Sequence, residues 1–146
     1  RSCYVDGMAR YDLVAATEAF KLGLNRLIQG SQKFQISLMC AEQDPIVCHR
    51  AILISPHLKN AGLNIYHILK TGDLESNKDL ENRVLKLHTL YDLLPENQSS
   101  AKQLSLFDIQ SNQTIEKQFN RAELVEKAYQ LQGEKVAYTE NKDDHE

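Results

Sequence analysis

Apolar residues recur at helical spacing in three stretches of the chain. The first stripe comprises Phe20, Leu24, Leu27 and Ile28. Thr17 is a suitable N-cap for it and Gly30 a suitable end, so this spacing predicts a helix between them. The second stripe comprises Leu80, Val84, Leu87 and Tyr91. Ser76 and Asp79 precede it with the spacing of a capping box. The third stripe comprises Leu124, Ala128 and Leu131, and it predicts a last helix near residues 121–132. Gly133 is a suitable end for this helix, and the alternative is an extension into residues 136–138.

Two other stretches have the pattern of buried strands. Residues 34–40 alternate apolar and polar side chains at first and end apolar on both faces, and residues 63–69 form a second apolar run. Residues 48–61 between them predict a helix that stops at Gly62. Pro56 favours one kinked helix there, and the alternative is a new helix that starts at the proline. Strand, helix and strand in this order predict a βαβ unit with a parallel pair of strands.

The rest of the chain is predicted to consist mainly of turns and loops. These parts are turns at 4–7 and 71–73, a short helix at 8–16, a polar loop at 95–102 and an apolar patch at 104–107. We therefore expect a single α/β domain over residues 1–140 and a disordered tail at 141–146. The expected fold is a three-layer α/β/α arrangement with a small, mainly parallel sheet and a helix-rich C-terminal part.

Composition excludes some classes of protein. The chain has 146 residues, of which 42% are apolar and 25% charged, as in an ordinary globular protein. A net charge of −3 does not indicate nucleic acid as a partner, although a local basic cluster would suffice to hold it. No apolar run is long enough to span a bilayer, so we expect no membrane partner. Three cysteines, an odd number, favour reduced thiols in a cytoplasmic protein.

The most reactive side chains lie where the first predicted strand leads into the following helix. Cys48, His49 and Arg50 open that helix. A helix N-terminus offers unpaired N–H groups and partial positive charge, so together with Arg50 it favours a small anionic ligand such as phosphate or carboxylate. The same field favours the thiolate of Cys48. In this interpretation Arg50 binds the anion, Glu42 or His49 moves a proton, and Cys48 is a nucleophile or shapes the site.

Two acids complicate this interpretation. Glu42 and Asp44 lie in the loop before the helix, and their carboxylates would repel a bound anion. They suit a general base, a metal ligand or ion-pair partners of Arg50 better. In the last case the acids and Arg50 form ion pairs that only stabilise the loop.

Cys40 and His67 are accessory candidates. Cys40 ends a predicted buried strand, a position more typical of core packing. His67 could reach the same sheet edge as His49, although a histidine that is hydrogen-bonded inside the sheet is the more ordinary case. Residues 10–12 could close over the site.

Cofactor chemistry is not indicated. Adjacent Cys48 and His49 would diverge by about 100° on a helix, so they rarely serve one zinc ion. The chain has no phosphatase-type cysteine loop, glycine-rich phosphate loop or dinucleotide fingerprint. We predict no metal and no cofactor.

The run Leu38-Met-Cys-Ala-Glu-Gln-Asp-Pro-Ile-Val-Cys-His-Arg50 resembles the DUF488 family of bacterial and archaeal proteins, which is named for its unknown function. Further similar segments are residues 4–9, 20–24, 65–68, 72–74, 122–125 and 136–138. The resemblance implies a three-layer α/β fold and a cytoplasmic bacterial protein, and it implies no particular reaction. Members of the family usually begin with a further strand and loop. The chain therefore resembles the C-terminal part of such a domain, with a sheet edge open to a partner or to a second copy in a homodimer.

Two functions follow as expectations. One is an enzyme that acts on a phosphorylated or nucleic-acid-type substrate at the junction between Cys40 and Arg50. The other is a non-enzymatic module that binds an anion or another protein at the same place. The sequence does not decide whether the chain is an enzyme.

Overall fold

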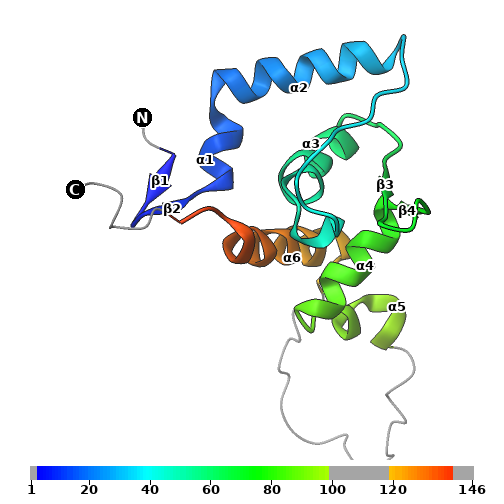
Figure 1. The fold of residues 1–146 in the computed structure, drawn as a ribbon. Coiled ribbons are helices and arrows are strands. Elements are labelled where there is room, and N and C mark those ends of the chain that lie inside the picture. The colour runs from blue at the N-terminus through cyan, green and yellow to red at the C-terminus, as the bar shows by residue number, and fades with distance from the viewer. Residues whose placement is uncertain (1–2, 99–118, 140–146) are drawn as a thin grey trace, which may run out of the picture.

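Helices dominate the computed structural model, which describes residues 3–98 and 119–139 (Figure 1). The α-helices are α1 (Tyr11–Ala16), α2 (Glu18–Ser31), α3 (Ser55–Asn60), α4 (Asn77–Leu87), α5 (Pro95–Gln98) and α6 (Arg121–Val136). The shorter helical turns are the 3₁₀-helices η1 (Pro45–Val47) and η3 (Tyr91–Leu93) and the π-helix η2 (Arg50–Ile54). The strands of the described residues are β1 (Tyr4–Val5), β2 (Met8–Ala9), β3 (Tyr66–Ile68) and β4 (Leu74–Ser76).

The expected three-layer fold with a small, mainly parallel sheet is wrong. The described residues contain two antiparallel pairs of strands, β1 with β2 and β3 with β4. Residues 34–40 form neither helix nor strand, so the predicted βαβ unit does not form. The second predicted strand instead pairs with the segment that follows it, because a tight turn at Gly72, with φ of +91°, brings β4 alongside β3. Such a local hairpin needs no crossover, whereas a parallel pair does.

The core lies where η2, α4 and α6 meet (Figure 1). Its buried residues are Ala51, Ile52, Leu80, Val84, Leu85, Leu94, Leu124, Val125, Ala128 and Tyr129. The second and third predicted stripes are therefore confirmed in part. Leu87 is 50% exposed, and Leu85 is buried on α4 in its place.

The ends of the helices follow their capping residues. The hydroxyl oxygen of Thr17 accepts the Phe20 N–H at 3.2 Å, which starts α2 as predicted. The Ser76 hydroxyl accepts the Asp79 N–H at 3.1 Å and starts α4. Asn120 caps α6 in a full capping box, and this helix continues past Gly133 to Val136, as in the predicted alternative with an extension.

The helix after Cys48 is distorted next to Pro56. Proline has no N–H to donate within a helix. The N–H of Ser55 bonds to the carbonyl of Arg50, five residues back, which makes a π-helical turn before α3 begins. Gly62, with φ of +84°, follows the end of the helix. This agrees with one distorted helix rather than two separate ones.

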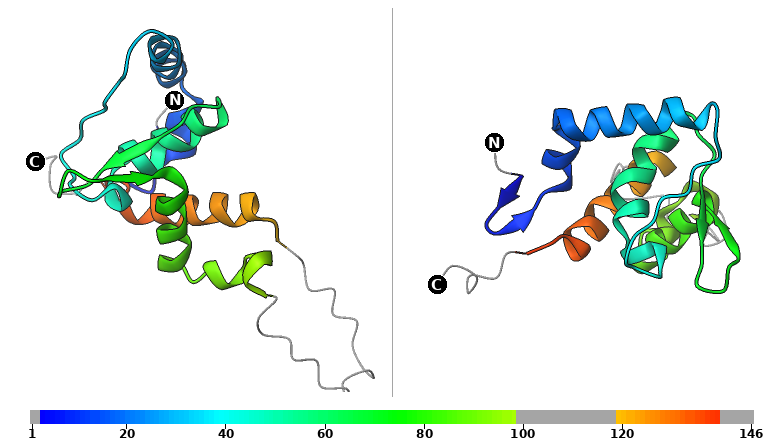
Figure 2. Two further views of the ribbon diagram at one scale, coloured as in Figure 1. Left: turned by 90° about the vertical axis from the view of Figure 1, so that its right-hand side faces the viewer. Right: turned by 45° about the horizontal axis from the view of Figure 1, so that its top comes forward.

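The N-terminal part lies to one side of the core. The predicted turn at 4–7 is the bend of the β1–β2 hairpin, and the helix expected at 8–16 starts only at Tyr11 because Met8 and Ala9 form β2. Helix α2 lies apart from α4 and α6 in Figures 1 and 2, and none of its residues is buried.

Some expectations concern residues that the structure does not describe. The apolar patch at 104–107 and the tail at 141–146 lie outside the described residues, as does most of the loop at 95–102, where α5 occupies the beginning. Among the residues that are described, no helix has the length and apolar character needed to cross a membrane.

Candidate functional site

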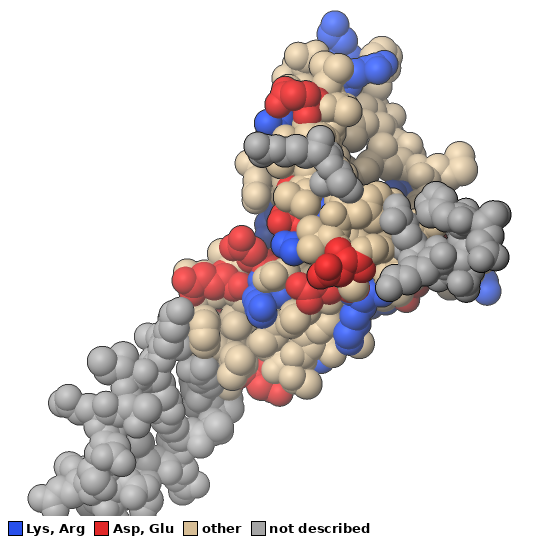
Figure 3. All heavy atoms as spheres, turned by 90° about the vertical axis from the view of Figure 1, so that its left-hand side faces the viewer, with Lys and Arg blue, Asp and Glu red and all other residues tan. Residues whose placement is uncertain are grey.

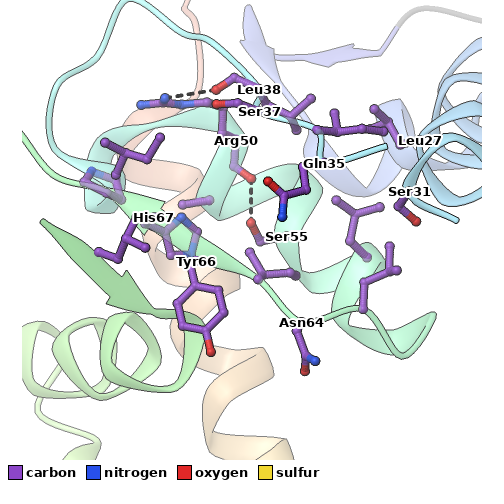
Figure 4. Close-up of a pocket in the computed structure, with 18 of the residues that line it drawn as sticks. Leu27, Ser31, Gln35, Ser37, Leu38, Arg50, Ser55, Asn64, Tyr66 and His67 are labelled. Atoms are coloured by element: carbon purple, nitrogen blue, oxygen red, sulfur yellow. Dashed lines mark hydrogen bonds between the residues drawn. The ribbon is translucent and has the colours of Figure 1, made fainter. Parts of the chain in front are cut away.

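Arg50 fastens the start of η2 to the segment before it. Its Nε donates to the Cys48 sulfur at 2.9 Å, one terminal nitrogen donates to the Leu38 carbonyl at 3.2 Å, and the other donates to the Glu42 carbonyl at 2.9 Å. Figure 4 shows the contact with Leu38. The guanidinium therefore uses backbone carbonyls and a sulfur as acceptors, where the sequence suggested carboxylates.

Asp44 has a different partner. Both of its carboxylate oxygens accept bonds from Arg83 on α4 at 2.9 Å, and one of them accepts the Ile46 N–H at 3.1 Å. Burial raises the pKa of Asp44, but the bonds from Ile46 and Arg83 outweigh it and hold the pKa below its ordinary value. Asp44 thus anchors the loop and starts η1.

Cys40 and Cys48 lie together, and their surroundings differ. Cys48 is fully buried, whereas Cys40 is half-buried. The Cys40 sulfur accepts the N–H of Glu42, is hydrogen-bonded by the Cys48 side chain and accepts the N–H of Ala41, with the charge of Arg50 nearby. These interactions lower the pKa of Cys40. The thiolate that the sequence suggested for Cys48 is therefore favoured at Cys40, the more accessible sulfur.

Glu42 acts on this cluster through its backbone. Its N–H points to the Cys40 sulfur and its carbonyl accepts from Arg50, while the residue itself is exposed. The backbone of Glu42 thus links Cys40 to Arg50, while its carboxylate stays at the surface.

His49 lies against Tyr11 of α1. The two ring centroids are 5.5 Å apart with the planes tilted by 56°. Tyr11 donates to the carbonyl of Val136 at 3.3 Å. Burial, together with the electrostatic effect of the neighbouring Cys40 and Cys48, raises the pKa of Tyr11 to about 12, so its hydroxyl stays protonated at neutral pH. Residues 10–12 were predicted to close over the site, but no sequence signal singled out Tyr11 as the residue that makes the contact.

His67 lies in a buried hydrogen-bonded chain. Its Nε2 is 3.1 Å from the Asn77 side-chain oxygen, and the Asn77 amide donates to Glu81 at 3.0 Å. Lys59 pairs with Glu81 from α3. Burial lowers the pKa of His67, and the bond to Asn77 offsets this only in part. His67 therefore resembles the ordinary case of a hydrogen-bonded buried histidine.

A pH dependence of stability follows from His67. Since its folded pKa lies below the unfolded value of about 6.5, the unfolded chain binds the proton more readily. His67 thus favours folding above that pH, and this contribution is lost as pH falls through the folded pKa. Urea unfolding between neutral and mildly acidic pH should show a smaller loss of stability for His67→Gln than for the unmodified chain. Equal losses in the two proteins would contradict this origin.

A cavity of about 770 Å³ separates residues 34–38 from β3 (Figure 4). Its lining is mostly apolar, and Arg50, Ser55 and His67 contribute polar groups. Ser55 donates to the Arg50 carbonyl at 2.8 Å. The two segments that were expected to pair as parallel strands thus face each other across this space. Among the residues with described positions, no group of three or more histidine, cysteine or acidic side chains could hold a metal ion.

The fold and the site define a small helix-rich protein with a pair of thiols beside a guanidinium at the start of a helix. Residues 1–55 match the family described as "Domain of unknown function DUF488". This segment contains both thiols and Arg50, so the chain carries DUF488 sequence where the candidate site lies, and the resemblance is confirmed there. No curated protein and no solved structure matches the chain. The similarity expected after residue 55, and the portion expected before residue 1, stay predictions.

Proposed function

We propose that the protein is a thiol-dependent enzyme that acts on a phosphorylated substrate, with Cys40 as its nucleophile. The observation that carries the proposal is the set of hydrogen-bond donors on the Cys40 sulfur, next to Arg50. A thiolate is the nucleophilic form of cysteine, and reactive cysteines lie in electropositive, partly exposed surroundings. Cys48, which is fully buried, then positions Cys40.

Arg50 supplies the affinity for an anionic group. It uses three of its five N–H groups on Cys48, Leu38 and Glu42. Those contacts fix the plane of the guanidinium, and the two other N–H groups can take up a phosphate oxygen beside the Cys40 sulfur. The exposed carboxylate of Glu42, or His49, is the predicted proton carrier.

A small substrate is favoured over nucleic acid. On the face shown in Figure 3, Lys and Arg side chains alternate with Asp and Glu side chains, and no broad basic patch is seen among the coloured residues. A nucleic-acid backbone is held mainly by clustered positive charge. The net charge of −3 favours the same conclusion.

Replacing Cys40 by serine tests the proposal. With p-nitrophenyl phosphate and bis-p-nitrophenyl phosphate as probes, Cys40→Ser should lower turnover by at least about 100-fold, because it removes the thiolate. The matched control is Cys3→Ser, a half-buried cysteine before β1, which should turn over at the unmodified rate. Undiminished turnover by Cys40→Ser would exclude Cys40 as the nucleophile.

A binding module without turnover is the second candidate. It is favoured by the three internal contacts of Arg50, which hold the guanidinium ready for an anion without any reaction. In this case inorganic phosphate should raise the melting temperature in a saturable way, the probes should not be hydrolysed, and Arg50→Met should abolish the shift.

A further inference from the structure

Cys40 and Cys48 have the arrangement of a redox pair. One guanidinium joins their two segments, since Arg50 donates to the Cys48 sulfur at 2.9 Å and to the carbonyls of Leu38 and Glu42, which lie on either side of Cys40 along the chain. The Cys48 side chain is also one of the groups that lower the pKa of Cys40, which agrees with neighbouring sulfurs. One sulfur is half-buried and the other is fully buried. Redox-sensing cysteines are typically an accessible thiolate next to a second thiol that resolves the first oxidation product.

We propose that a hydroperoxide oxidises Cys40 and that Cys48 then converts it into a reversible Cys40–Cys48 disulfide. The disulfide itself does not depend on the proposed enzyme activity. Its regulatory consequence rests on that proposed function, since an oxidised Cys40 cannot act as a nucleophile.

The chemistry balances in two steps. The Cys40 thiolate attacks one peroxide oxygen, so that an S–O bond forms, the O–O bond breaks, and the leaving oxygen takes a proton to become an alcohol or water. Cys40 is then a sulfenic acid, and the peroxide has been reduced. The Cys48 sulfur next attacks the Cys40 sulfur, the S–S bond forms, and hydroxide leaves and is protonated to water. A dithiol reductant reverses the result by thiol–disulfide exchange.

Arg50 favours the second step. Its Nε donates to the Cys48 sulfur at 2.9 Å, which holds in place the sulfur that must attack. The full burial of Cys48 keeps dissolved oxidants away from it, so Cys40 is the sulfur that reacts first.

The backbone at Cys48 is anchored to the rest of the fold more firmly than the backbone at Cys40. Cys48 directly follows η1, whose start is anchored to α4 by the contacts of Asp44 with Arg83. Cys40 lies in a segment that forms neither helix nor strand. The shift that forms the S–S bond can therefore come from the Cys40 side, while Cys48 stays in place.

Intact-mass analysis and peptide mapping test the proposal on the full chain. After treatment with a small excess of hydrogen peroxide, the protein should lose two hydrogen atoms, and a peptide containing Cys40 should be linked to one containing Cys48. Dithiothreitol should restore the original mass. Cys3→Ser should behave in the same way, and Cys48→Ser should instead accumulate a sulfenic acid at residue 40 that dimedone captures.

Several results would overturn the redox pair. These are unchanged mass, a link that involves Cys3, or oxidation that continues past the sulfenic acid in the unmodified chain. The peptide map of the unmodified chain decides the matter even if Cys48→Ser does not fold. A disulfide that forms in a protein without turnover would refute the proposed enzyme and leave the redox pair standing. Turnover without a disulfide would refute the redox pair and leave the proposed enzyme standing.

Discussion

Replacing Leu80 by alanine should lower the free energy of unfolding by about 3 kcal/mol. Leu80 lies on α4 with no exposed surface and belongs to the cluster that α4 shares with α6 and η2. Removing its side chain loses apolar contacts and leaves a cavity that the surrounding helices can fill only in part. Since domains are stable by roughly 5–15 kcal/mol, this is a large share of the total. Urea denaturation followed by circular dichroism measures it.

Leu22→Ala is the matched control for this prediction. Leu22 is also a helical leucine, but it lies on α2 and is 65% exposed. Its replacement should change stability by no more than about 0.5 kcal/mol. If the two variants lost the same stability, the core would not lie between α4 and α6.

The helices could be predicted because their signals are local. Thr17 and Ser76 cap the helices that follow them, and each cap involves residues within three positions along the chain. The apolar stripe of α4 likewise needs only a helical repeat to identify its buried face. Local signals of this kind do not depend on which other element covers the stripe.

The sheet could not be predicted because strand pairing depends on distant partners. The alternation at 34–40 indicates an extended chain, but it does not name a neighbouring strand. In the structure Phe34 is 70% exposed and Met39 is 93% exposed, so this segment is not buried as the pattern suggested. The turn at Gly72 gives β3 a nearer partner in β4. The sequence predicted this turn at 71–73, but it did not predict that the residues after the turn form a strand.

The motif indicated the segment of the candidate site, but residue types alone did not show which sulfur in it receives the hydrogen bonds. The position of Cys48 at a helix start predicted that it carries the reactive thiolate. The structure buries Cys48 and directs the N–H groups of Ala41 and Glu42 to the Cys40 sulfur. The direction of a backbone N–H depends on the path of the loop, which residue types alone do not specify. Tyr11 was predicted only as part of a segment that could close over the site, because its contacts with His49 and Val136 join distant parts of the chain.

Arg50→Met should lower the free energy of unfolding by about 2 kcal/mol and make Cys40 less reactive. Methionine keeps much of the apolar stem and removes every N–H donor. The carbonyls of Leu38 and Glu42 then lose their charged partner, and the loop that directs the Glu42 N–H to Cys40 is released. Because that N–H and the charge of Arg50 both hold the pKa of Cys40 down, the pKa should rise. The rate of alkylation by iodoacetamide, followed against pH, measures the change.

Two further variants separate the geometry of Arg50 from its charge. Arg50→Lys keeps a positive charge without the planar fork, so its alkylation profile should fall between those of Arg50→Met and the unmodified protein. Arg26→Met, at an exposed position on α2, should leave the profile unchanged. Performing each measurement in the Cys3→Ser background leaves Cys40 as the accessible thiol, because Cys48 is fully buried. If the alkylation profile of Arg50→Met matched that of the unmodified protein, Arg50 would only fasten the loop. The proposal that Cys40 is an activated nucleophile would then be contradicted.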